Sequence, residues 1–166
     1  MPSGTALRLS MELSYPEWMT CRWLSAFGPE ETERLMRAGN ERHQVFVFAN
    51  TLAVTPYALS EALDTDGFGG EPVAWMPGYL AIREAEGLFL SHLFKKGHFI
   101  AQDPAAGMAV LLLDPRPDMR VIDLCAAPGG KTVNIAVAME DRGEVFSLDL
   151  HPGRSGLVGK TISRLG

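Results

Sequence analysis

Residues 121–132 constrain the fold more than any other part of this 166-residue chain. They read Val-Ile-Asp-Leu-Cys-Ala-Ala-Pro-Gly-Gly-Lys-Thr, an apolar, β-branched run that leads into two glycines and then into a helical sequence. Such a run is typical of a buried parallel strand. Because glycine has no side chain, a ligand can approach the backbone of the turn and the free N–H groups of the next helix. The segment therefore predicts a strand, glycine turn and helix of the kind that holds nucleotides.

The next strand-like run, residues 144–150, carries an acidic residue near its end. Asp149 follows Gly130 by 19 positions, where a carboxylate accepts hydrogen bonds from ribose hydroxyls in nucleotide-binding sheets. The elements expected around it are a helix at 104–113, a strand at 120–124, a helix at 131–140 and a weak helix after residue 150. This order predicts the opening half of a doubly wound α/β sheet. Glycines in the last helix cost about 1 kcal/mol each relative to alanine, so we expect that helix to be frayed or remodelled.

Two kinds of phosphate-binding loop do not match the glycine turn. A Walker-type loop needs glycine five residues before Gly130, where Cys125 stands. A dinucleotide fingerprint needs glycines at its first, third and sixth positions, and residues 125–132 supply one adjacent pair. A pyrophosphate would therefore have little room, and a phosphate-loop nucleotidase is a remote alternative.

A ligand with a nucleoside and no phosphate fits these residues better, and S-adenosylmethionine is the common one. Its charged amino-acid end suits the glycine turn and the N–H groups near Lys131, while Asp149 suits both ribose hydroxyls. The competing interpretation is structural: a tight strand–helix turn, with Asp149 at an exposed strand end.

The segment before residue 102 predicts a small α+β domain. A helix is expected over residues 15–38, broken at Gly28-Pro29. The elements expected after it are strands at 45–50, 72–76, 79–83 and 98–101 and helices at 55–63 and 87–94. We expect the aromatic side chains Trp18, Trp23, Phe46 and Phe48 to pack in the core rather than to stack on bases.

Composition excludes several classes of protein. A hydrophobic content of 46% with 21% charged residues indicates a folded domain rather than a disordered chain. Cys21 and Cys125 show no paired spacing and the four histidines no ligand spacing, so neither a disulfide framework nor a metal site is expected. Apolar runs are too short to cross a bilayer. We expect a monomeric, cytoplasmic protein whose net charge of −5 argues weakly against nucleic-acid binding.

Residues 123–132, Asp-Leu-Cys-Ala-Ala-Pro-Gly-Gly-Lys-Thr, closely resemble the cofactor loop of the Sun/Nop-type RNA cytosine-5 methyltransferases. Residues 15–18, Tyr-Pro-Glu-Trp, are similar to the first helix of that family. Residues 50–52, Asn-Thr-Leu, are similar to a strand end in its small RNA-recognition-like domain, and residues 97–103 to the segment that leads into its catalytic domain. The resemblance covers roughly residues 15–166, and the ten-residue loop is its specific part.

The resemblance implies a cofactor site. It implies that loop residues wrap the methionine and ribose portions of S-adenosylmethionine, that Asp149 holds the ribose hydroxyls and that Arg154 lies near the adenosine. The expected cofactor-binding residues are Cys125, Ala126, Ala127, Pro128, Gly129, Gly130, Lys131, Asp149 and Arg154. We expect the Cys125 thiol, like that of Cys21, to pack as a small hydrophobic group rather than to react.

The resemblance also implies the chemistry. A cysteine thiolate adds to C6 of cytosine, C5 then attacks the sulfonium methyl group, a base removes the C5 proton and the thiolate leaves. In this family one cysteine performs the addition, and a second, in an Asp-x-Pro-Cys strand end, assists release. Neither segment occurs in these residues. We therefore expect no catalytic residue here, a nucleophilic cysteine downstream of Gly166, and no activity from this chain alone.

The expected fold class is α/β. The domains predicted are a leader at residues 1–14, a small α+β RNA-recognition-like domain at 15–101, and the first two strands of a truncated Rossmann-like methyltransferase domain at 102–166. The resemblance implies the N-terminal portion of an S-adenosylmethionine-dependent RNA methyltransferase with rRNA as its partner. The alternative is a non-catalytic module that binds RNA or protein and retains a vestigial cofactor loop.

Overall fold

The computed structural model describes residues 4–41 and 43–166. Contacts divide the chain between His43 and Gln44 into two compact units, and each is described by itself.

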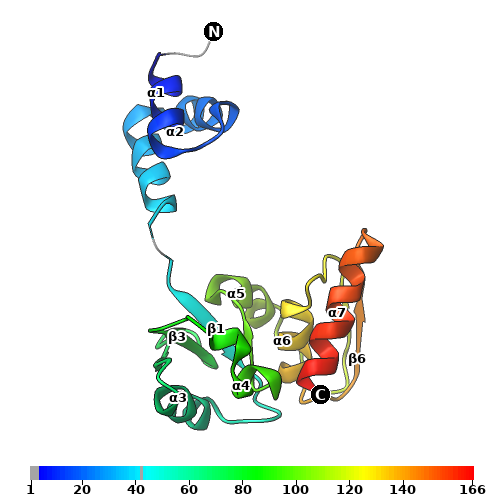
Figure 1. Cartoon of the computed structure of the whole chain (residues 1–166). Coiled ribbons are helices and arrows are strands. Elements are labelled where there is room, and N and C mark those ends of the chain that lie inside the picture. Colours follow the sequence, from blue (N-terminus) through cyan, green and yellow to red (C-terminus); the bar gives the residue numbers. More distant parts are fainter. Residues whose placement is uncertain (1–3, 42) are drawn as a thin grey trace. The chain divides into compact units, whose positions relative to one another are not determined.

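Helices α1 (Gly4–Leu13) and α2 (Glu17–Gly39) form the first unit (Figure 1). Gly28 interrupts α2 with φ 77° and ψ 172°, outside the helical region, directly before Pro29. This is the break that the Gly-Pro pair predicts. The helices pack through an apolar cluster made of Leu9, Leu13, Tyr15, Trp23, Leu24 and Met36.

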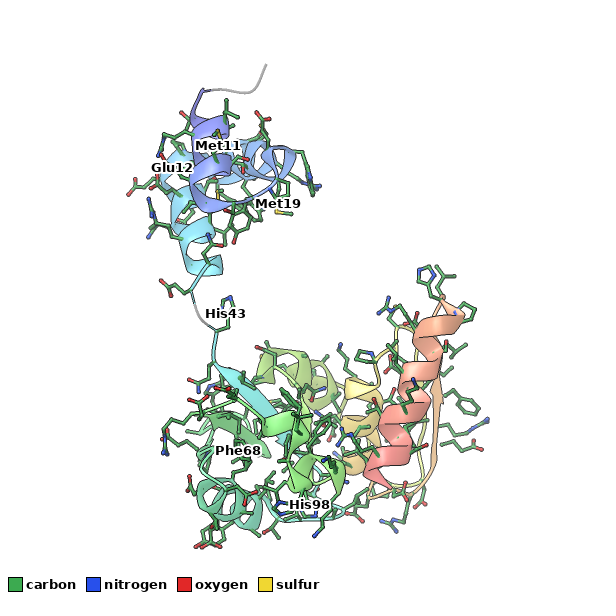
Figure 2. All side chains as sticks on the ribbon, in the orientation of Figure 1. Met11, Glu12, Met19, His43, Phe68 and His98 are labelled. Atoms are coloured by element: carbon green, nitrogen blue, oxygen red, sulfur yellow. The ribbon has the colours of Figure 1, made fainter. Side chains whose placement is uncertain are left out.

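Some side chains of this unit lie elsewhere than the sequence predicts. Residues 4–13, inside the segment expected as a leader, form α1 and contribute Leu9 to the buried cluster. Met11 lies on the exposed face of the same helix (Figure 2). Trp18 is 65% exposed, so the core position expected for it is wrong, and Cys21 is only half-buried. Trp18 precedes the buried Thr20 by two positions, which places the two residues on different sides of the helix.

The sheet of the second unit has the order β2-β3-β1-β4, with antiparallel neighbours. Its strands are β1 (Val45–Ala49), β2 (Gly70–Pro72), β3 (Tyr79–Ile82) and β4 (Phe99–Ala101). Helix α3 (Pro56–Thr65) buries Leu59 and Leu63 in one cluster with Val47 of β1. Phe48, the next residue of β1, packs in a different cluster with α6 (Gly130–Ala138). Strand alternation thus gives this sheet two covered faces.

Two elements between these strands differ from the expected ones. The strand predicted at 72–76 lies at 70–72, and the residues after it turn, because Val73 N–H bonds to Tyr79 O at 2.9 Å and Met76 N–H to Val73 O at 3.0 Å. The helix predicted at 87–94 is a short 3₁₀ turn, Leu88–Leu90, followed by α4 (His92–Lys95). Ser91 separates them because its extended backbone and its hydroxyl, which accepts from Phe94 N–H, begin a new helix.

The C-terminal part alternates helices with parallel strands, as expected. Helix α5 (Pro104–Leu113) begins with Asp103 as N-cap, whose carboxylate accepts from Ala105 N–H at 2.8 Å. Strands β5 (Arg120–Asp123) and β6 (Glu144–Ser147) pair in parallel on either side of α6 in sequence. An apolar cluster of Val110, Val121, Ile135 and Met139 joins α5, β5 and α6.

Helix α7 (Pro152–Leu165) is continuous over 14 residues, so the frayed helix expected from its glycines is wrong. Tertiary contacts outweigh the low helix propensity of glycine here. Val158 is buried against Ala126 and Ala127 of the glycine turn. At the other end, the Arg164 guanidinium lies 3.8 Å from the centre of the Phe94 ring and donates to Phe94 O and Phe99 O. In Figure 1, α7 runs beside α6.

Within the described residues, no helix has the length and apolar character that a membrane crossing requires.

Asn50 links three parts of the second unit and is 3% exposed. Its Nδ2 donates to Gly97 O at 3.0 Å and to Leu165 O at 3.1 Å, while its Oδ1 accepts from Leu52 N–H. The side chain of Asn50, which the sequence comparison likens to a strand end of an RNA-recognition-like domain, thus forms hydrogen bonds within the fold.

Replacing Asn50 by alanine leaves the backbone carbonyls of Gly97 and Leu165 without their hydrogen-bond donor. This loss should lower the free energy of unfolding by about 1–3 kcal/mol. Urea denaturation measures this change. The control is Gln44→Ala, which removes a single hydrogen bond, to Ile82 O, from an exposed side chain and should change stability less. Equal effects of the two substitutions would contradict a structural role for Asn50.

Candidate functional site at the glycine turn

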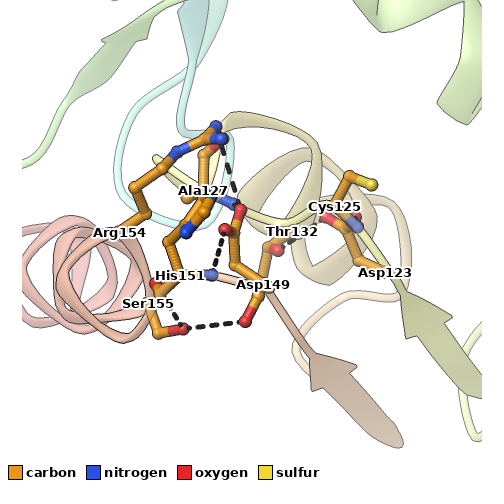
Figure 3. A network of polar contacts seen from close by, with 8 residues as sticks. All are labelled: Asp123, Cys125, Ala127, Thr132, Asp149, His151, Arg154 and Ser155. Atoms are coloured by element: carbon orange, nitrogen blue, oxygen red, sulfur yellow. Dashed lines mark hydrogen bonds and ion pairs between the residues drawn. The ribbon is translucent and has the colours of Figure 1, made fainter.

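The carboxylate of Asp123 ties the end of β5 to the start of α6. Its Oδ1 accepts from Cys125 N–H at 3.3 Å, and its Oδ2 accepts from the Thr132 hydroxyl at 2.9 Å. The Thr132 hydroxyl also lies 3.0 Å from the Ser147 hydroxyl at the end of β6. These contacts, partly visible in Figure 3, hold the loop between β5 and α6 against the ends of the two strands.

The turn itself requires glycine. Gly129 has φ 108°, a backbone conformation that other residues rarely adopt, and a Cβ there would lie 3.3 Å from Thr161 Cβ on α7. Helix α6 then begins at Gly130, and within the described part of the chain no side chain caps it. The first N–H groups of α6 and its positive dipole end are therefore available to an anionic or acceptor ligand.

Asp149 is the second residue after β6 and lies beside this turn. Ala127 N–H donates to its Oδ2 at 3.3 Å and His151 N–H to its Oδ1 at 3.2 Å (Figure 3). The hydrogen bond from His151 lowers the pKa of Asp149 below its ordinary value of 3.8, with further contributions from Ala127 N–H and the Arg154 charge that outweigh the effect of burial. The carboxylate is thus held ionised and oriented by the loop.

Arg154, on the first turn of α7, lies over that carboxylate. One of its Nη atoms is 3.8 Å from Asp149 Oδ2 and donates to Ala127 O at 3.4 Å. The Asp149 side chain is 5% exposed, while that of Arg154 is 56% exposed. An exposed guanidinium thus lies beside a nearly buried carboxylate.

A cavity of about 210 Å³ adjoins the turn. Its walls are Cys125, Ala126, Ala127, Pro128, Gly130 and Lys131 from the loop and Ala101, Gln102, Asp103 and Ala106 from the segment that enters α5. Seven of the nine predicted cofactor residues belong to the loop, and six of them line this cavity. Asp149 and Arg154 do not line it, but both contact the backbone of Ala127. The structure thus brings the predicted residues together.

The site differs from the sequence prediction in the exposure of one residue, and it contains one residue that the prediction missed. The Cys125 side chain is exposed, so the packing role expected for it is wrong; the small buried residues of the loop are Ala126 and Ala127. Gln102 was not predicted as a site residue, although it lines the cavity. Its position between a strand and the N-cap Asp103 was visible in the sequence, but its neighbours across the fold were not.

A second cavity, of about 190 Å³, lies near the C-terminal end of α6. Its lining is mainly apolar and includes Val137, Met139, Val145, Ile162 and Leu165. Within the described residues, no group of three or more His, Cys, Asp or Glu side chains is placed to hold a metal ion.

A parallel strand pair, a glycine turn and an acidic residue after the second strand form the arrangement that is found in α/β nucleoside-binding domains. Two family models match the chain. The model for the ferredoxin-like domain of RsmF/B-like methyltransferases matches residues 15–87, and the model described as 16S rRNA methyltransferase RsmB/F matches residues 110–166. The chain belongs to this Sun/Nop-type family of RNA methyltransferases. The predicted family and α/β fold class are confirmed.

Individual relatives agree with this assignment. The chain is 34% identical over 96% of its length to a probable ribosomal RNA small subunit methyltransferase B of Bacillus subtilis, of which it covers 35%. It is 27% identical over 92% of its length to the 25S rRNA (cytosine-C(5))-methyltransferase nop2 of Schizosaccharomyces pombe, of which it covers 25%. The crystal structure of a methyltransferase homologue from Pyrococcus horikoshii superposes on 99% of this chain and 54% of that one, with 26% identity and a TM-score of 0.82. The chain spans about a third of the length of the curated relatives it matches first.

Because the folded pKa of Asp149 is lowered, its charge contributes stability above the ordinary carboxyl range, and this contribution is lost as the pH falls. The difference in unfolding free energy between the native chain and Asp149→Asn should therefore be present at pH 7 and shrink below about pH 4. Urea denaturation of both proteins at pH 7, 4 and 3 measures it. A difference that stays constant over this range would contradict the interaction.

Proposed function

We propose that this chain binds S-adenosylmethionine at the glycine turn and is the cofactor-binding portion of an RNA cytosine-5 methyltransferase. The observation that carries the proposal is the position of the Asp149 carboxylate beside the open N-terminus of α6. A carboxylate offers about four lone-pair directions, and the two N–H bonds from Ala127 and His151 use two of them. The two remaining lone-pair directions can accept hydrogen bonds from the two hydroxyls of a ribose.

The rest of the cofactor fits the same groups. The open N–H groups of α6 favour the charged amino-acid end, and Cys125, Ala126 and Pro128 line the cavity beside these groups. Arg154 lies beside the Asp149 carboxylate that we assign to the ribose, and a guanidinium stacks well on a flat aromatic base, so it suits the adenine.

The proposed substrate is rRNA. The names of the relatives from Bacillus subtilis and Schizosaccharomyces pombe supply the substrate class, and the second also supplies the C5 position of cytosine. The ferredoxin-like portion, matched at residues 15–87, is the part we expect to contact RNA.

Calorimetric titration with S-adenosylmethionine tests the cofactor. The wild-type chain should bind it, and Asp149→Asn should bind at least tenfold more weakly because the hydroxyls lose a charged acceptor. Glu144→Gln, at the other end of β6, is the matched control and should bind like the wild type. Absence of binding, or equal binding by the wild type and Asp149→Asn, would overturn the proposal. Retained RNA affinity without cofactor binding would favour a non-catalytic module.

We also propose that the 166-residue chain alone does not methylate RNA. Cytosine C5 reacts only after a thiolate adds to C6, and the thiols present are Cys21 in α2 and Cys125 within the cofactor loop. The purified chain, incubated with rRNA and labelled S-adenosylmethionine, should therefore form no 5-methylcytosine above background. Formation of 5-methylcytosine that is lost in Asp149→Asn would contradict this expectation.

A further inference from the structure

Gln102 is a buried amide whose orientation is set by two neighbours. It lies between β4 and the N-cap of α5 and is 8% exposed. The Tyr79 hydroxyl donates to its Oε1, and Asn134 Nδ2 donates to the same atom at 3.0 Å. Asn134 Nδ2 also lies 2.9 Å from the Tyr79 oxygen, which closes the cluster. Because an amide oxygen accepts and an amide nitrogen donates, both contacts require Oε1 to face the cluster.

The other end of this amide therefore faces the glycine turn. A Cβ placed on Gly130 would lie 3.2 Å from Gln102 Nε2, and Gln102 lines the cavity beside the loop. Among the described residues, no protein acceptor is bonded to Nε2. Gln102 is a largely buried residue and its Nε2 opens into the cavity, so this N–H₂ group is available to a ligand oxygen there.

We infer that Gln102 Nε2 donates a hydrogen bond to the carboxylate of the amino-acid end of the cofactor. This inference rests on the proposed function and adds a binding residue to it. The positive charge around the cavity indicates which group accepts this hydrogen bond. Lys131 lines the cavity, and α6 begins at Gly130 in the same lining, so the surroundings favour an anionic oxygen over a neutral one. The ribose is assigned elsewhere, to Asp149.

Tyr79 and Asn134 hold the donor in place without touching the ligand. Tyr79 is on β3 and Asn134 on α6, so the cluster connects the antiparallel sheet to the cofactor helix. Burial raises the pKa of Tyr79 to about 12, and its hydroxyl therefore stays protonated and remains a donor to Gln102 at any physiological pH. The antiparallel sheet thereby contributes to the geometry of the cofactor site.

The test compares two ligands on the 166-residue chain by calorimetry. S-adenosylhomocysteine contains the amino-acid end, whereas 5′-methylthioadenosine has the same nucleoside and lacks it. Gln102→Leu, which removes the donor at similar volume, should weaken S-adenosylhomocysteine binding roughly ten- to a hundredfold. Its binding of 5′-methylthioadenosine should stay within about twofold of wild type. Tyr79→Phe, which removes one of the two contacts that orient the amide, should show a smaller loss for S-adenosylhomocysteine alone.

Ile82→Val is the matched control, because it truncates a buried residue of β3, the strand that carries Tyr79, whose side chain packs in the other apolar cluster with Leu59 and Leu63. It should lower the melting temperature and leave the ratio of the two affinities unchanged. The inference is overturned if Gln102→Leu weakens both ligands equally, or neither, or if the wild type binds both with the same affinity. A wild type that binds neither ligand overturns the proposed function as well.

Discussion

Helix α6 is buried on two sides, and the arrangement of the proposed site depends on this double burial. Val133 and Val137 pack on the antiparallel sheet, while Ile135 and Met139 pack with β5 and α5. A helix held between two sheets has little freedom to rotate or slide, because interiors are close-packed. Its N-terminus is therefore fixed relative to the ends of β5 and β6, where Asp123 and Asp149 stand.

This arrangement explains why residues far apart in the sequence share one site. Asp123 and Thr132 fix the loop from the strand side, and Val158 of α7 covers its small alanines. Gln102 reaches the turn from the segment between β4 and α5, with an orientation set by the buried cluster. Each of these contacts joins a different element to the loop or to the first turn of α6, so the site depends on several elements of the second unit.

The sequence predicts the elements well where local signals are strong. Asp103-Pro104 marks the start of α5, the Gly28-Pro29 break lies where it is expected, and the apolar strand with its glycine pair predicts β5 and the turn. The burial expected for that strand is wrong, because Val121 is buried while Ile122 is 63% exposed. Prediction from the sequence fails where contacts between residues distant in the sequence determine the local structure. The glycines of α7 indicate a weak helix, but Arg164 and Val158 stabilise it through partners distant in sequence. Gln102 could not be predicted as a site residue because Tyr79 and Asn134 reach it only in the fold.

The central claim is that the glycine turn, rather than the apolar cavity near the other end of α6, receives the cofactor. Backbone amide NMR spectra recorded while S-adenosylhomocysteine is added test it directly. We expect the largest shifts on the non-proline residues of 125–131 and 149–154, together with the side-chain amide of Gln102. Shifts that instead concentrate on residues 136–145 and 162–166, which surround the apolar cavity, would contradict it.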